Sequence, residues 1–272
     1  MVIDYHQFTE RNIGLLNESE QQHIKESHIA VFGVGGLGGV ISEILVRSGV
    51  GSLTIVDRDV FEISNLNRQI FAFSDTVGQR KTDVAENFLC RINPGLNLIK
   101  ENVVETGNIG RIMHDVDIAI LALDDIIPCI IISRFARNHN IPVVEGWAIP
   151  FGNVRVFTKD TPGLEEVYNM PTTGKDISTI SEEERKTLNL RMLYELQAIE
   201  GIEEHYSEVA LQRINQGTIT SFAPMVWLTA SIMAGEALKI ILNKGEIALS
   251  PDFNLYDPFK NRIPKQRHHE NH

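Results

Sequence analysis

A glycine-rich turn in the first quarter of the chain has the composition of a phosphate-binding loop. Gly33, Gly35 and Gly38 follow a short β-branched run, with Gly36 as an additional glycine among them. Glycines at this spacing let the backbone approach a phosphate closely where a helix begins. Asp57 ends the next apolar run, where a carboxylate can hold ribose hydroxyls. Taken alone, these residues predict nucleotide binding and also permit an NAD- or FAD-dependent oxidoreductase.

Two basic residues, Arg68 and Lys81, follow this acid along the chain, and an oxidoreductase has no need of them there. Transfer of AMP from ATP to a carboxylate develops negative charge on the α-phosphoryl oxygens and on pyrophosphate, so fixed cations stabilise the transition state. Asp124, at the end of a later apolar run, offers an oxygen ligand for magnesium. We predict that Arg68, Lys81 and Asp124 are catalytic and that Asp124 holds the metal.

The sequence pattern predicts strands and helices that alternate along the chain and that would bring these residues to one edge of a sheet. The β-branched runs cover residues 29–32, 53–56, 98–100, 118–123 and 143–146, and segments with three- and four-residue apolar spacing separate them. This alternation predicts an α/β, Rossmann-like, doubly wound sheet that is mostly parallel and covered on both faces. Phosphates then bind beyond the carboxyl end of the first strand. A C-terminal antiparallel extension and an inserted helical crossover complete the predicted fold.

We predict four segments. They are an N-terminal helical arm (residues 1–27), an ATP-binding Rossmann-like domain (28–159), a helical crossover insertion that recognises the acceptor (160–216), and a helix and strand that complete the same domain (217–272).

Three stretches carry local signals. Residues 160–175 have little periodicity and are expected to form a flexible crossover rather than a core element. Ser181 and Glu184 match a capping box, which predicts a polar helical stretch from there toward Gln216. The apolar segment 224–242 is interrupted by charged residues that would be expensive in lipid, so it is predicted to be a buried helix.

Several motifs occur together in a fixed order. They are Gly33-Val34-Gly35-Gly36-Leu37-Gly38, Asp57-x-Asp59, Ser64-Asn65-Leu66-x-Arg68-Gln69, Val77-Gly78-Gln79-x-Lys81, Arg91-Ile92-Asn93-Pro94 and Asp124. In this combination the chain resembles the ThiF/MoeB/HesA adenylyltransferases, relatives of the ubiquitin-activating enzymes. The resemblance runs from about residue 11 to 157 and resumes weakly at 217–242.

The resemblance implies roles for individual residues. Asp57 would bind ribose, while Asn65, Arg68 and Lys81 would contact phosphates. Arg11 resembles an N-terminal arginine that family members insert into the partner subunit's site, which implies a homodimer and makes Arg11 a fourth catalytic candidate. The predicted cofactor-binding set is Gly33, Gly35, Gly36, Gly38, Asp57, Asp59, Ser64, Asn65, Arg68, Lys81, Asp124 and Asp125.

The chain departs from the family pattern in its cysteines and at Asp125. Relatives with a structural zinc carry paired Cys-x-x-Cys motifs, whereas this chain has only Cys90 and Cys129, so no structural zinc is expected. Residues 160–216 hold no cysteine either, which predicts that activation stops at the acyl-adenylate. Asp125 stands where many relatives have Asn, and it would either tune metal binding or face solvent.

Composition bounds the class of protein. The 272 residues carry a formal net charge of −11 and no basic cluster, which argues against a nucleic-acid partner. No secretory signal or membrane-spanning segment is visible, and the two isolated cysteines suit a reducing compartment. We therefore expect a cytoplasmic protein that binds neither nucleic acid nor membrane.

The leading hypothesis is an ATP- and magnesium-dependent adenylyltransferase that activates the C-terminal carboxylate of a peptide or small ubiquitin-like protein. Two alternatives remain open at the level of sequence. One is a nucleotide-binding subunit without catalysis, such as the inactive half of a heterodimer. The other is the oxidoreductase that the glycine turn and Asp57 permit.

Overall fold

A single mixed sheet organises the computed structural model, which describes residues 3–148, 152–197, 207–216, 220–256 and 265–266. The strands are β1 (His28–Phe32), β2 (Ser52–Val56), β3 (Asn97–Glu101), β4 (Ile118–Leu121), β5 (Val143–Ala148), β6 (Gly152–Phe157), β7 (Phe253–Tyr256) and β8 (Lys265–Gln266). Their order is β3-β2-β1-β4-β5-β6-β7-β8. Strands β1 to β5 pair in parallel, and β5 to β8 pair antiparallel. The Rossmann-like fold and its antiparallel extension are thus confirmed.

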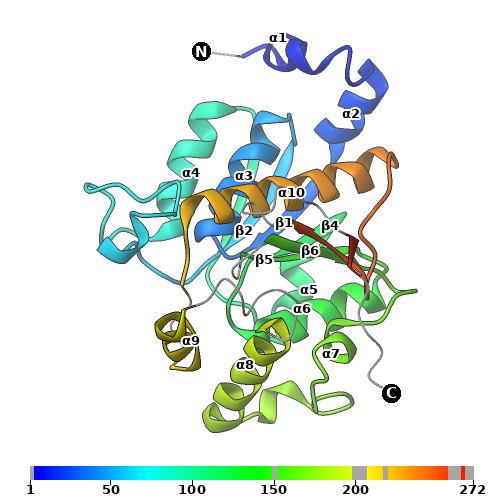
Figure 1. Ribbon diagram of the computed structural model, residues 1–272. Helices are drawn as coiled ribbons and strands as arrows, with labels where there is room; N and C mark the ends of the chain where they lie inside the picture. Colours follow the sequence, from blue (N-terminus) through cyan, green and yellow to red (C-terminus); the bar gives the residue numbers. More distant parts are fainter. Residues whose placement is uncertain (1–2, 149–151, 198–206, 217–219, 257–264, 267–272) are drawn as a thin grey trace.

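Helices cover both faces of the sheet (Figure 1). One face carries α3 (Gly36–Arg47), α4 (Lys81–Ile92) and α10 (Ala223–Leu242). The other carries α5 (Ile109–Ile112), α6 (Ile126–Asn138), α7 (Leu164–Val167) and α8 (Glu182–Gln197), and α9 (Glu208–Asn215) contributes Ile214 to the same hydrophobic cluster as α8. Because β4 and the last four residues of β1 are buried on both faces of the sheet, these stretches are continuous runs of apolar residues.

The N-terminal arm packs against the amino edge of the sheet. It consists of α1 (Tyr5–Thr9), the 3-10 turn η1 (Glu10–Asn12) and α2 (Glu18–Glu26). The Tyr5 hydroxyl donates to the Gly49 carbonyl at 2.7 Å, and the Asn12 amide donates to the Ser48 carbonyl at 3.3 Å. Both acceptors follow the C-terminal end of α3, so the arm lies at the end of α3 opposite the glycine turn.

The expectation of a flexible crossover at residues 160–175 is wrong. Leu164, Tyr168 and Met170 are buried in the same hydrophobic cluster as α6. The Tyr168 hydroxyl donates to the buried Glu145 carboxylate at 2.8 Å, and burial raises the pKa of Glu145. Arg134 of α6 also donates to the carbonyls of residues 172 and 175. These contacts order a segment whose short turns leave no periodic signal in the sequence.

The capping box that begins the next helix is confirmed. The Ser181 amide donates to the Glu184 carboxylate at 2.9 Å, and the Glu184 amide donates back to the Ser181 hydroxyl at 3.3 Å. Helix α8 follows, and α9 lies within the remainder of the predicted helical stretch. Residues 198–206 fall outside the described part of the chain.

Helix α10 is the predicted apolar helix of the C-terminal segment. Met225, Ala230 and Met233 are among its buried residues, and the helix packs on α3 and strand β5. Glu236 is buried too and accepts from Lys239 Nζ at 2.6 Å. Among the described residues it is the one helix whose length and composition would allow a membrane span, but its contacts are those of a helix that covers a sheet.

The burial of α8 gives a stability prediction. Met192 is 1% exposed, whereas its neighbour Tyr194 is 56% exposed. We expect Met192→Ala to lower the free energy of unfolding by about 2 to 5 kcal/mol, because it leaves a cavity in the core. Tyr194→Ala, on the outer side of the same helix, should change it by less than about 0.5 kcal/mol. Denaturant unfolding measures both, and equal effects would show that the crossover is not part of the core.

Candidate active site

The glycine turn brings helix α3 directly onto the end of β1. Gly33 has φ +94 and its amide donates to the Val56 carbonyl at 2.8 Å. A Cβ on Gly38 would lie 1.7 Å from the Gly33 carbonyl oxygen, so only glycine fits there. Gly35 caps α3 without a side-chain hydrogen bond, which leaves backbone N–H groups at the carboxyl edge of the sheet. Such a helix start is suited to bind phosphate.

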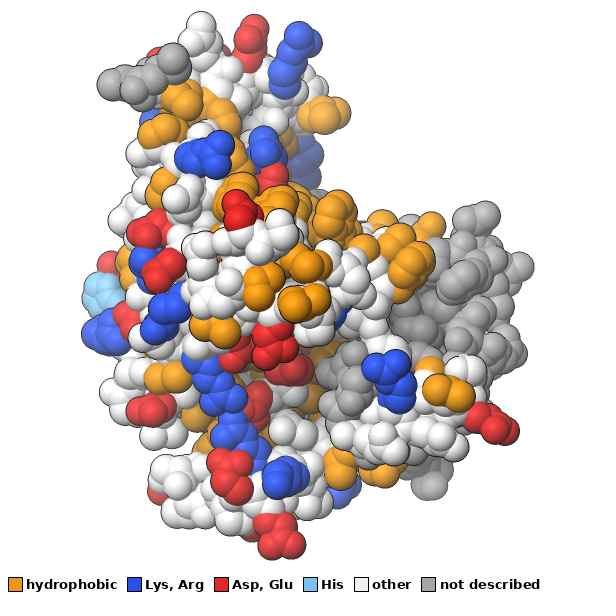
Figure 2. All heavy atoms as spheres, turned by 90° about the vertical axis from the view of Figure 1, so that its left-hand side faces the viewer, with side chains coloured by type: hydrophobic (Ala, Val, Ile, Leu, Met, Phe, Trp, Pro, Cys, Tyr) orange, Lys and Arg blue, Asp and Glu red, His pale blue; other side chains and the backbone are white. Residues whose placement is uncertain are grey.

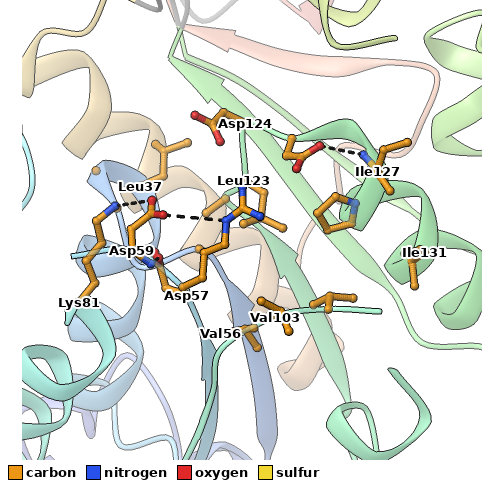
Figure 3. A pocket seen from close by; sticks show the side chains of 18 of the residues that line it. Leu37, Val56, Asp57, Asp59, Lys81, Val103, Leu123, Asp124, Ile127 and Ile131 are labelled. Carbon is orange, nitrogen blue, oxygen red and sulfur yellow. Dashed lines mark hydrogen bonds and ion pairs between the residues drawn. The ribbon is translucent and has the colours of Figure 1, made fainter. Parts of the chain in front are cut away.

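A cavity of about 640 Å³ opens at this edge (Figure 3). It combines a charged end, where Asp57, Asp59 and Lys81 gather, with an apolar end around Ile127 and Ile131. Most of the predicted site residues line it: Gly33, Gly35, Gly36, Asp57, Asp59, Arg68, Lys81, Asp124 and Asp125. The remaining four, Gly38, Ser64, Asn65 and Arg11, do not.

Asp57 joins the glycine turn to the end of β2. Its carboxylate accepts from the Val34 amide at 2.7 Å and from the Asp59 amide at 2.8 Å. Burial raises the pKa of Asp57, and the Lys81 charge and these two amides work in the opposite direction. Asp57 therefore shapes the turn in addition to facing the cavity.

Lys81 is held in place by Asp59. Its ammonium lies 3.1 Å from the Asp59 carboxylate, and its side chain is only 8% exposed, whereas that of Asp59 is 59% exposed (Figure 3). The Lys81 amide also donates to the Asp59 carbonyl at 3.0 Å, where α4 begins. A largely buried cation is thus fixed beside the glycine turn.

The segment before α4 positions Arg68. Its guanidinium donates to the Ser64 carbonyl at 2.9 Å and to the Asn67 side chain at 2.8 Å. Burial lowers the pKa of Arg68, and the charge of Asp124 partly offsets this. Asn65 closes the 3-10 turn η2 (Ile63–Asn65) by accepting from the Glu62 amide at 3.1 Å. Ser64 and Asn65 therefore support Arg68 in this structure and do not reach the cavity themselves.

Asp124 and Asp125 have different surroundings. Asp124 is exposed and lines the cavity beyond the end of β4. Asp125 caps α6 by accepting from the Ile127 amide at 3.3 Å and forms an ion pair with Arg185 of α8. Sequence analysis expected Asp125 either to tune a metal or to face solvent, and it did not foresee these contacts with Ile127 and Arg185.

The described residues contain no cluster of three or more side chains able to ligate a metal. Asp124 nevertheless fits magnesium, because that ion commonly takes only one or two carboxylates and completes its shell with water and substrate phosphates. The phosphates of a nucleotide bound in this cavity would therefore supply the remaining ligands of the metal.

Several residues of the cavity escaped sequence analysis. Gln69 is 8% exposed, and its side-chain oxygen has no hydrogen-bond partner although the residue lines the cavity beside Gly35. Gln69 ends the motif Ser64-Asn65-Leu66-x-Arg68-Gln69, and this position was the signal in the sequence that could have identified it. Arg58 lies between Asp57 and Asp59 of another quoted motif, so the same kind of signal was present for it. Trp147 and the apolar lining gave none, because their approach depends on tertiary packing. This lining comprises Val56, Val103, Val104, Leu123, Ile127 and Ile131.

Arg11 lies far from this cavity. It is exposed in η1, and the arm packs against the C-terminal end of α3. The glycine turn lies at the other end of that helix of 12 residues, about 18 Å away at 1.5 Å per residue. Arg11 does not reach the site of its own chain, so its catalytic role remains a prediction that requires a second subunit.

The close packing at Gly38 gives a testable prediction. We expect Gly38→Ala to destabilise the protein by about 1 to 3 kcal/mol, because its Cβ overlaps a backbone oxygen and forces α3 away from β1. ATP binding should weaken in parallel. Gly235→Ala in α10, where a Cβ meets nothing within 4 Å, should leave binding unchanged. Unfolding curves and calorimetry measure both, and normal ATP affinity in Gly38→Ala would contradict this role of the turn.

The sequence of this chain is similar to those of several characterised enzymes. A molybdopterin-synthase adenylyltransferase of Salmonella typhimurium is 30% identical over 87% of this chain and 81% of its own length. A tRNA threonylcarbamoyladenosine dehydratase of Bacillus subtilis is 35% identical over 51% of this chain and 55% of its own. The alignments with the curated relatives of highest similarity span only about half of those proteins.

Solved structures with a similar fold include PaaA and Escherichia coli MccB with ATP. PaaA has a TM-score of 0.67 and 24% identity over 97% of this chain and 80% of its own. MccB has a TM-score of 0.64 and 20% identity over 91% of this chain and 65% of its own. The ThiF family model matches residues 9–272. With nearly its whole length matched, this chain belongs to the ThiF family.

Proposed function

We propose that the protein is an ATP-dependent adenylyltransferase that activates the C-terminal carboxylate of a peptide or small ubiquitin-like protein. The observation that carries the proposal is that Arg68, Lys81 and Asp124 share one cavity with the glycine turn. Relatives named as molybdopterin-synthase adenylyltransferases, and one from Haloferax volcanii named as a SAMP-activating enzyme E1, support the reaction class.

The reaction forms one bond and breaks one. A carboxylate oxygen of the acceptor attacks the α-phosphorus of ATP, and the bond to the β-phosphate oxygen breaks, so the products are acyl-adenylate and pyrophosphate. Lys81 and Arg68 neutralise charge on the phosphates, and the N–H groups at the start of α3 bind phosphate oxygens. Because Lys81 is largely buried, its charge is screened by water less than that of a surface lysine.

Magnesium is the metal proposed for this site, with Asp124 as its protein ligand. When bound, it would neutralise phosphate charge. Asp57 would hold the ribose, and the apolar end of the cavity would take the adenine base. NAD and FAD have no triphosphate whose charge must be neutralised. The two cations Arg68 and Lys81 therefore favour ATP as the ligand over either dinucleotide.

Activation is proposed to stop at the adenylate on this chain. Cys129 is buried, and burial raises its pKa well above the ordinary value; burial also raises the pKa of Cys90 in α4. Among the described residues, no cysteine lines the cavity. A thiol with a raised pKa is a poor nucleophile, because the thiolate is the reactive form.

A homodimer is the proposed assembly, with Arg11 entering the partner's site. Exposed hydrophobic side chains gather on the face of the molecule that Figure 2 shows, consistent with a protein interface. In the segment before α4 they are Val60, Ile63, Leu66, Phe73 and Val77. Recognition of the acceptor by residues 160–216 and a cytoplasmic location also remain proposals.

The central test of catalysis is the exchange of labelled pyrophosphate into ATP in the presence of acceptor peptides. We expect Lys81→Ala to lower the exchange rate by about a hundredfold or more, because it removes a fixed charge from the transition state. Lys100→Ala is the matched control, since Lys100 pairs with Asp83 and Glu86 outside the cavity. Equal exchange by Lys81→Ala and the parent protein would refute the assigned role.

Mixing two inactive variants tests the shared site. Arg11→Ala and Lys81→Ala each carry one defect, so a mixed dimer holds one site in which both side chains are intact. We expect the mixture, after subunit exchange, to recover part of the pyrophosphate exchange that each variant lacks. No recovery in dimers shown to be mixed would contradict the role of Arg11.

A further inference from the structure

Helix α8 of the crossover makes two polar contacts with the start of α6, directly after Asp124. Arg185 Nε donates to Asp125 at 3.1 Å, and its terminal nitrogen contacts the other oxygen of the same carboxylate. One helical turn later, the Asn189 side chain accepts from the Ile126 amide at 2.8 Å. Residues four apart lie on one face of a helix, so both contacts come from the same side of α8.

The ion pair is partly shielded from water. The side chains of Arg185 and Asp125 are 25% and 15% exposed, whereas Glu182, the second carboxylate near Arg185, is 79% exposed. Burial and the charge of Arg58 both lower the pKa of Arg185. A bidentate, half-buried pair has a more fixed geometry than an exposed one. The Arg185–Asp125 contact can therefore fix α8 relative to the start of α6, whereas the exposed contact with Glu182 lies within α8 and cannot.

The same elements build one wall of the nucleotide cavity. Ile177, Ser178 and Arg185 line it from the crossover, together with Asp57 and Arg58 from the end of β2. Leu188 and Met192, three and seven residues after Arg185, bury this same face of α8 in the core, so the helix should stay folded when the ion pair at its edge is lost. The position of this wall thus depends on the polar contacts at its edge.

We propose that Arg185 is a positioning residue which, through Asp125, fixes the crossover wall over the nucleotide cavity and so couples ATP binding to the order of α8. The inference rests on the proposed function, since it takes ATP as the ligand. Because coupling is reciprocal, ATP must stabilise the docked position of α8 as much as docking favours ATP.

Hydrogen exchange and calorimetry test the coupling without any chemical step. In the parent protein, ATP should slow amide exchange across residues 182–197. Arg185→Gln and Asp125→Asn should each abolish this slowing and raise the dissociation constant for ATP about tenfold. Asn still offers an oxygen to the Ile127 amide, so Asp125→Asn keeps the helix cap while it removes the charge. Glu182→Gln, which loses the exposed contact alone, should behave as the parent.

The double variant separates positioning from direct contact. If the two residues act as one unit, Arg185→Gln with Asp125→Asn should bind ATP no more weakly than either single variant. Additive losses, or ATP affinity within twofold of the parent in a folded Arg185→Gln protein, would overturn the proposal. A parent that binds no ATP would overturn both this inference and the proposed function. ATP-dependent protection of α8 without pyrophosphate exchange would overturn the proposed function alone.

Discussion

The contact between Gly38 and the Gly33 carbonyl is the constraint from which the geometry of the cavity follows. With no Cβ between them, α3 begins against the end of β1, and its first N–H groups face the carboxyl edge of the sheet. The Asp57 carboxylate then binds the Val34 amide, which fixes the end of β2 to the same turn. Asp59 extends this order to Lys81 and hence to α4. All of these contacts are made within the protein, to backbone groups or to the buried Lys81. The charged end of the cavity is therefore arranged before any ligand binds.

The rest of the cavity lining is positioned by packing between segments far apart in the sequence. Arg68 is held by its own turn, and its carbonyl accepts from the Trp227 indole of α10 at 2.8 Å. From the crossover, Ile177, Ser178 and Arg185 line the cavity, while Tyr168 and the buried residues of α8 anchor that segment in the core. The described contacts that hold this region are an apolar core and the Arg185–Asp125 pair. The crossover and the cavity thus meet at the start of α6.

Sequence reasoning predicted what depends on local pattern. The β-branched runs gave the five parallel strands to within a few residues, and the glycine spacing with Asp57, Arg68 and Lys81 gave the charged end of the cavity. It failed where the determining contacts join distant segments. The crossover lacks periodicity, so its burial was missed, and nothing near Arg185 in the sequence indicates that it meets Asp125, 60 residues earlier. Ser64 and Asn65 do not line the cavity in this structure, so their predicted contact with the nucleotide remains a prediction.

The attack of a carboxylate oxygen on the α-phosphorus is the central claim, and isotope transfer tests it directly. An acceptor peptide labelled with ¹⁸O in its C-terminal carboxylate would be incubated with ATP and the protein, and hydroxylamine would then release AMP from the acyl-adenylate. The account predicts that this AMP carries one ¹⁸O atom from the peptide. Release of ADP and phosphate, or AMP free of the label in the presence of a consumed acceptor, would contradict it.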